Sequence, residues 1–166
     1  MTDITNKIDT LRASMVYHSI EMRKYRDDFG GRIMNYILTG NVAIIKTLLE
    51  INFLHPQYDT FDFTGGNSGN PEDSYLMLEL IADQNGPIPN YKEMIDLILS
   101  HGAHVDDHAG AITPLEFALI KQNIPVAAYL MSKGGTYNIE EIKDFCDSVK
   151  IDLVAMMNEE YAKLIA

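Results

Sequence analysis

The sequence predicts an all-α fold made of short antiparallel helix pairs. Apolar residues recur at steps of three and four along most of the chain, which is the spacing of one helix face. Residues that start helices and residues that end them alternate at short intervals, so each helix is brief. The length of 166 residues suits one domain, and a hydrophobic content of 46% is typical of globular proteins.

The best-formed pair lies in residues 113–138. Thr113 is a favourable N-cap, Pro114 suits the first helical position, and Glu116 completes a capping box with Thr113. A first helix is therefore expected over Leu115–Ile120.

The second helix of this pair is expected over Val126–Met131. Gln122 and Asn123 break the chain before it, and Gly134 can adopt the left-handed conformation that ends a helix. The stretch Asn90–Asp106 repeats this second-helix pattern and its glycine ending.

These two stretches resemble the ankyrin repeat. The residues that match its pattern are Thr113, Pro114, Leu115, Phe117, Ala118, Gly134 and Asn138 in one stretch, and Glu93, Leu97, Leu99, Gly102, Ala103 and Val105 in the other. Glu116 stands where the family has histidine. The resemblance implies an ankyrin-like solenoid of about three helix-turn-helix repeats with N- and C-terminal helical caps.

The N-terminal half is expected to contain three parts of this single domain, which spans residues 1–166. Residues 1–31 form an N-terminal helical cap or a degenerate first repeat, because apolar residues recur there at helical steps. Those residues are Ile4, Ile8, Leu11, Met15, His18, Met22 and Tyr25. Residues 32–53 form a divergent repeat. Residues 54–73 form an inserted loop, either exposed and mobile or in contact with a partner.

The C-terminal half holds the two clear repeats, residues 74–106 and 107–138. Ser74 is expected to cap a helix over Tyr75–Asp83. Residues 139–166 are expected to form the C-terminal helical cap, with Asn138 and Asp152 as helix N-caps.

The formal net charge is −11, and the acidic residues are unevenly distributed. Residues 56–108 hold ten acidic residues and one lysine, and residues 139–166 hold seven acidic residues and three lysines. This charge disfavours direct nucleic-acid binding, which depends on neutralising phosphates. It either serves solubility or attracts a partner with a basic surface. An acidic decoy that occupies a nucleic-acid-binding protein is one alternative function.

The sequence gives no sign of a membrane span or a secretory signal. No run of 18 or more apolar residues occurs, and the N-terminus lacks an apolar core. Cys146 is the only cysteine, which excludes an intrachain disulfide and favours a cytoplasmic or other reducing intracellular compartment. The short, divergent, acidic repeats are also similar to ankyrin proteins of viruses and intracellular bacteria. That similarity implies an effector or inhibitor in the host cell cytoplasm.

One cluster has the chemistry of metal ligands. His101, His104 and His108 lie beside Asp106 and Asp107, and imidazole and carboxylate groups bind zinc or iron. The alternative is a polar hairpin between repeats. No Ser-His-Asp, Cys-His or paired-carboxylate arrangement is visible, so we expect neither an enzyme nor a cofactor.

The expected function is protein binding through finger loops and the concave face, as an adaptor or inhibitor. The resemblance places eight candidate partner-binding residues there: His104, Asp107, His108, Ala109, Ile112, Glu116, Ile120 and Lys121. An exposed pair of Ile112 and Ile120 would form a hydrophobic contact centre. The alternative is that both turn inward. The sequence leaves the oligomeric state open.

Overall fold

The computed structural model describes residues 31–57, 61–62, 74–110, 112–149 and 152–166. They are helical except for connecting turns and one antiparallel pair of two-residue strands, β1 (Phe61–Asp62) and β2 (Ser74–Tyr75). The helices are residues 31–38, α2 (Val42–Glu50), α3 (Met77–Ala82), α4 (Tyr91–Ser100), α5 (Pro114–Ile120), α6 (Ile124–Ser132), α7 (Ile139–Val149) and α8 (Leu153–Ile165). The expected all-α class is confirmed. The expected N-terminal cap lies, up to residue 30, outside the described residues.

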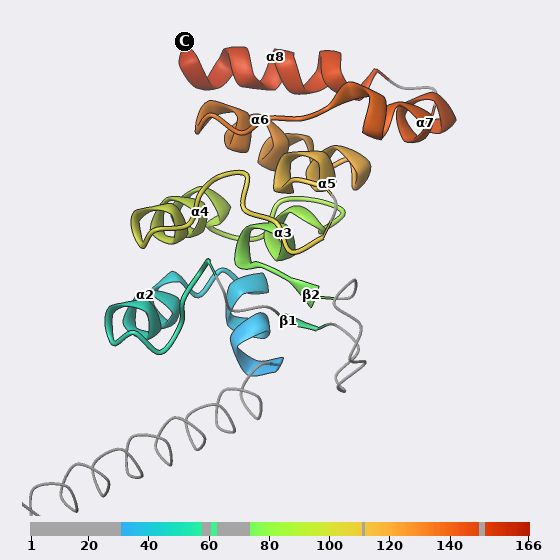
Figure 1. Cartoon of the computed structure of the whole chain (residues 1–166). Coiled ribbons are helices and arrows are strands. Elements are labelled where there is room, and N and C mark those ends of the chain that lie inside the picture. Colours follow the sequence, from blue (N-terminus) through green and yellow to red (C-terminus); the bar gives the residue numbers. More distant parts are fainter. Residues whose placement is uncertain (1–30, 58–60, 63–73, 111, 150–151) are drawn as a thin grey trace, which may run out of the picture.

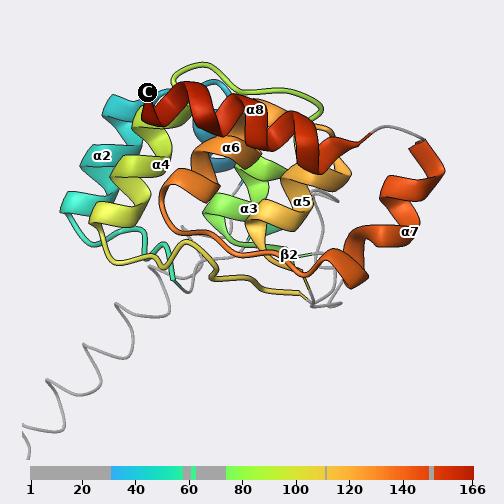
Figure 2. The same cartoon turned by 90° about the horizontal axis from the view of Figure 1, so that it is seen from above.

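The helices stack as four layers (Figure 1). Residues 31–38 and α2 form the first layer, α3 and α4 the second, α5 and α6 the third, and α7 and α8 the fourth. Successive contacts join α2, α4, α6 and α8 into one row, and α3, α5 and α7 into the other. Seen from above, α8 lies across α6 while α7 lies apart from it, at the side of α5 (Figure 2). Each helix of the fourth layer therefore continues one of the two rows.

The local helix-start and helix-stop signals are confirmed. The Thr113 hydroxyl accepts the Glu116 N–H at 3.3 Å, and the Glu116 carboxylate accepts the Thr113 N–H at 2.6 Å. Asp152 accepts the Ala155 N–H at 2.9 Å at the start of α8. Gly134 has φ of +92° just after α6, a conformation that glycine adopts without a side-chain clash.

One predicted helix start was wrong. Ser74 and Tyr75 do not open a helix, because their backbone pairs with Asp62 and Phe61 in the two-stranded sheet. The helix α3 begins later, at Met77. Part of the expected 54–73 loop is thus a strand, while residues 58–60 and 63–73 lie outside the described part.

Residues in the left-handed conformation mark equivalent positions in three of the layers. Asn52, Gly102 and Gly134 follow α2, α4 and α6, with φ of +53°, +100° and +92°. Asn52 stands in the first layer where the second and third layers have glycine, and asparagine tolerates this conformation better than most residues. The three second helices can therefore be compared position by position.

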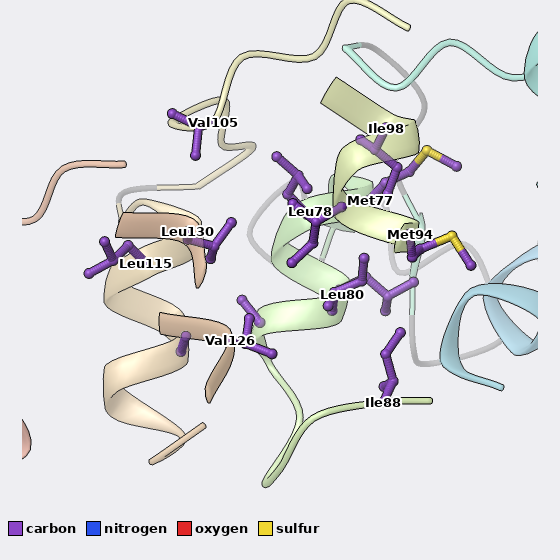
Figure 3. Close-up of a cluster of buried hydrophobic side chains, with 14 of the residues drawn as sticks. Met77, Leu78, Leu80, Ile88, Met94, Ile98, Val105, Leu115, Val126 and Leu130 are labelled. Atoms are coloured by element: carbon purple, nitrogen blue, oxygen red, sulfur yellow. The ribbon is translucent and has the colours of Figure 1, made fainter. Parts of the chain in front are cut away.

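A single apolar core runs through the layers. Side chains of α3, α4, α5 and α6 interdigitate in it, as Figure 3 shows. Every residue of α3 is buried, including Met77, Leu78, Leu80 and Ile81. The second layer thus offers no exposed side chain on its first helix.

Candidate functional site

The segment His101–Ile112, here called the finger, joins α4 to α5. Its tip is a tight turn in which the Asp107 N–H donates to the His104 carbonyl at 3.0 Å. The Asp107 carboxylate accepts the His104 N–H at 2.6 Å, which closes the turn a second time. Val105, at the centre of the turn, is buried in the core. The tip is therefore fixed from within, while His104, His108 and Ala109 are exposed.

A carboxylate ties the finger to the next connecting segment. Asp106 accepts the Thr136 backbone N–H at 2.8 Å and the Thr136 hydroxyl at 2.9 Å. The Thr113 hydroxyl donates to the Thr136 carbonyl at 2.9 Å. The finger and residues 133–138 thus form one connected edge, here called the finger edge.

Two buried glutamates hold this edge to the helices. Glu79 is 1% exposed and accepts the N–H groups of Leu76 at 2.7 Å and Ala109 at 3.0 Å. Glu116 is 2% exposed and accepts the N–H groups of Thr113 at 2.6 Å and Asn138 at 2.7 Å. Each carboxylate joins the start of its own helix to the segment of the following layer. Buried N–H groups need such partners, so both glutamates stabilise the edge.

Burial raises the pKa of the Glu79 carboxyl above its ordinary value of 4.5. Bonds from the backbone N–H groups of Leu76, Ala109 and Gly110, together with nearby His108, act in the opposite direction. Desolvation outweighs them because the carboxylate is withdrawn from water.

Glu116 was wrongly expected to contact a partner, because its buried carboxylate is occupied by two backbone donors. The sequence did contain a signal for this role. A Leu-Glu pair occurs at the same place in both helices, as Leu78-Glu79 and Leu115-Glu116. The glutamate of each pair makes a bond to the segment of the following layer.

The remaining candidates are Ile112, at the end of the finger, and Ile120 and Lys121, at the end of α5. Ile112 and Ile120 are half-buried, and Ile120 packs against the core. Lys121 forms an ion pair with Asp83, with Nζ 2.9 Å from Oδ1. The expected exposed isoleucine pair is therefore absent, and the inward alternative describes Ile120. The structure leaves His104, Asp107, His108 and Ala109 together at the finger tip.

The histidines of the finger bond to protein groups. His101 Nδ1 lies 2.9 Å from the Leu97 carbonyl, and His108 Nδ1 lies 2.8 Å from the Asp106 carbonyl. The His104 Nδ1 accepts the Asp106 N–H at 3.3 Å. Within the described residues, no three or more His, Cys, Asp or Glu side chains are grouped as metal ligands would be.

The opposite edge, where the two helices of each layer connect, is held by asparagine. The Asn90 side-chain amide donates to the Gly40 carbonyl at 3.1 Å, and that of Asn123 donates to the Gly86 carbonyl at 3.1 Å. Both bonds reach back to the preceding layer. We call this side the turn edge. The sequence contained a signal for this edge, because an asparagine or aspartate directly precedes the second helix of each layer. These residues are Asn41, Asn90, Asn123 and Asp152.

A shallow groove lies on the turn edge between α2 and α4. It is lined by Thr39, Gly40, Asn41, Val42, Ala43, Asn90 and Glu93. Glu93 is its single charged residue. The groove therefore lacks the converging charged groups that a substrate or ion site needs.

A separate cluster joins α4 to α6. The Tyr91 and Tyr129 rings meet edge to face at 5.8 Å, and the Lys133 ammonium lies 4.8 Å from the Tyr129 ring centroid. Asp96 accepts the Tyr129 hydroxyl at 2.8 Å and pairs with Lys133 at 2.7 Å. Burial and this bond to Asp96 raise the pKa of Tyr129. Because Asp96, Lys133 and the Tyr129 hydroxyl bond to one another, the cluster connects α4 to α6 and stabilises the contact between two layers.

No helix among the described residues is both long enough and apolar enough to cross a membrane. No family model, no curated protein and no solved structure matches this chain.

Proposed function

We propose that the chain is an ankyrin-like solenoid that binds another protein, without catalysis, through its finger edge. The stacked helix pairs, the left-handed residues after α2, α4 and α6 and the turn between layers support the ankyrin-like assignment. One observation carries the binding proposal. The finger tip is exposed at His104, His108 and Ala109, yet it is held from behind by Asp106, Asp107 and Glu79.

A loop fixed in this way suits recognition. Ordering flexible side chains and loops costs free energy on binding, and an already ordered loop avoids much of that cost. The acidic chain, with its net charge of −11, favours a partner whose contacting surface is basic. The ordered finger therefore provides a surface of fixed shape for the partner, and the negative charge of the chain attracts a basic partner toward it.

Affinity purification of the full chain from cell lysates, compared with two arginine variants, tests this function. Ala109→Arg changes an exposed tip side chain and keeps the backbone N–H that Glu79 accepts. Ala155→Arg places the same side chain on exposed α8, away from the finger. We expect one protein to be retained by the unmodified chain and by Ala155→Arg, and to be lost with Ala109→Arg.

Two results would contradict the proposal. One is retention of that protein by both variants alike. The other is an unmodified chain that retains no protein above the level of a mock column. Circular dichroism of Ala109→Arg must match that of the unmodified chain for its loss of binding to count.

A further inference from the structure

The first layer, formed by residues 31–38 and α2, has a described neighbour on only one side (Figure 1). On α2, Ile45 and Leu49 are buried, whereas Ile44 and Leu48 are half-buried. Ile51, the residue that caps the end of α2, is 64% exposed. Ile44, Leu48 and Ile51 recur at steps of four and three and form a second apolar stripe. A surface helix that ended the protein here would be expected to carry polar residues along such a stripe.

The register of the layers shows what this stripe contacts elsewhere. Counted back from the left-handed residues, Ile44 and Leu48 correspond to Met94 and Ile98 in α4. They correspond likewise to Val126 and Leu130 in α6. All four of these counterparts are fully buried. The same positions are therefore covered in the second and third layers and only partly covered in the first.

In the third layer, helices of the layer before it contribute to covering these positions. The helix α6 contacts α3, and Val126 and Leu130 lie in the same cluster as Leu78 and Leu80 (Figure 3). The helix α4, in the same layer as α3, also contacts α6, so helices of the preceding layer take part in burying these positions. By the same register, Ile44 and Leu48 face the place of a helix that precedes residues 31–38.

We propose that residues 2–28 of the same chain supply this helix and pack on the Ile44–Leu48–Ile51 stripe of α2. The segment enters directly before residue 31, and its sequence has one apolar face, with Ile8, Leu11 and Met15 at its centre. A helix from Ile4 to Tyr25 is about 31 Å long at 1.5 Å per residue. Two packed helices span about 20 Å, so the segment can cross both helices of the first layer.

Placement can be tested by cysteine cross-linking in the full chain. Cys146 is replaced by alanine, and Leu11→Cys is paired with Ile44→Cys. The matched pair combines Leu11→Cys with Ala155→Cys, on exposed α8 at the other end of the stack. With a short bifunctional thiol reagent in dilute protein, we expect most of the 11/44 pair to become cross-linked within one chain. The 11/155 pair should give at most a tenth of that yield.

Three outcomes would overturn the assignment. They are equal yields for the two pairs, no product for the 11/44 pair, or an 11/44 product that joins two chains and increases with protein concentration. The last would assign the stripe to a second copy of the protein.

Urea unfolding supplies an independent measurement without cysteine replacement. Leu11→Asp places a charge in the apolar face of the segment, and Asn6→Asp places the same charge on the opposite face by helical spacing. We expect a lower midpoint for Leu11→Asp and an unchanged midpoint for Asn6→Asp. Equal midpoints would contradict the proposal, because a charge on a segment that packs against nothing would have the same effect on either face.

Discussion

The finger edge and the turn edge join the same layers by opposite chemistry. At the finger edge the ties are carboxylates, Glu79 and Glu116, that accept backbone N–H groups. At the turn edge the ties are side-chain amides, Asn90 and Asn123, that donate to backbone carbonyls. Helix direction explains the difference. The first helices begin at the finger edge, where their first N–H groups need acceptors. They are followed at the turn edge by turns whose carbonyls accept from the two asparagines.

The choice of residue follows from this direction. A carboxylate has two oxygens and can accept donors from two segments at once, as Glu116 does from Thr113 and Asn138. An amide has N–H groups and can donate to a carbonyl, as Asn90 and Asn123 do, whereas a carboxylate cannot. Variants that exchange these chemistries should therefore fail in different ways at the two edges.

The largest loss of stability is expected for Glu116→Ala. The Thr113 and Asn138 N–H groups would lose their acceptor in a buried place, which we expect to cost about 3 kcal/mol. Urea unfolding measures it. Glu93→Ala removes an exposed glutamate of α4 and should change the unfolding free energy by less than about 0.5 kcal/mol. Similar effects of the two variants would show that the finger edge does not depend on its buried carboxylate.

Asn123→Asp should cost about 2 kcal/mol of unfolding free energy. It removes the N–H donor to the Gly86 carbonyl, and it places a carboxylate where the native Asn123 side chain is 0% exposed. Asn41→Asp is the matched change. Asn41 only accepts, from the Ile44 N–H at 3.4 Å, and aspartate accepts equally well at a helix start. Thermal unfolding should separate the two variants. A pair of equal melting temperatures would contradict the donor role.

Two glycines in the left-handed conformation allow the packing of the two edges to be compared, since one lies at each edge. At Gly40, on the turn edge, a Cβ would lie 2.1 Å from the Pro89 carbonyl oxygen. At Gly134, on the finger edge, a Cβ would meet nothing within 4 Å. Gly134→Ala should therefore cost only the left-handed conformation, about 1 kcal/mol. Gly40→Ala should lower the unfolding free energy by more than this, and chemical denaturation measures both variants. Equal losses of stability would show that the turn edge is packed less tightly than the structure describes.

The smallest effect expected is a pH dependence at Glu79. Because its pKa in the folded chain is raised above 4.5, its contribution to stability is fully present below pH 4.5 and is lost as pH rises through the raised value. The difference in unfolding free energy between the unmodified chain and Glu79→Gln should therefore fall between pH 4.5 and neutrality. A difference in unfolding free energy that grows over this range would contradict a raised pKa of Glu79 in the folded chain. The charge of His108 on the finger lowers the pKa of Glu79, so His108→Gln is the background for a second series.

The sequence by itself determined the helix pairs and most of their ends. Thr113, Pro114, Gly134 and Asp152 act on backbone groups within three or four residues of themselves. Such signals depend little on the rest of the fold, which is why they were visible without it.

The tertiary structure decided the contacts between layers. Glu79 bonds to Ala109 and Glu116 to Asn138, which stand 30 and 22 positions further along the chain. The start of α3 moved because Ser74 and Tyr75 found strand partners, and Ile120 turned toward the core. No local pattern specifies such partners, since they meet only when the layers stack. The sequence thus determined the helix pairs, and stacking decided that Glu116 belongs to the interior and the finger tip to the surface.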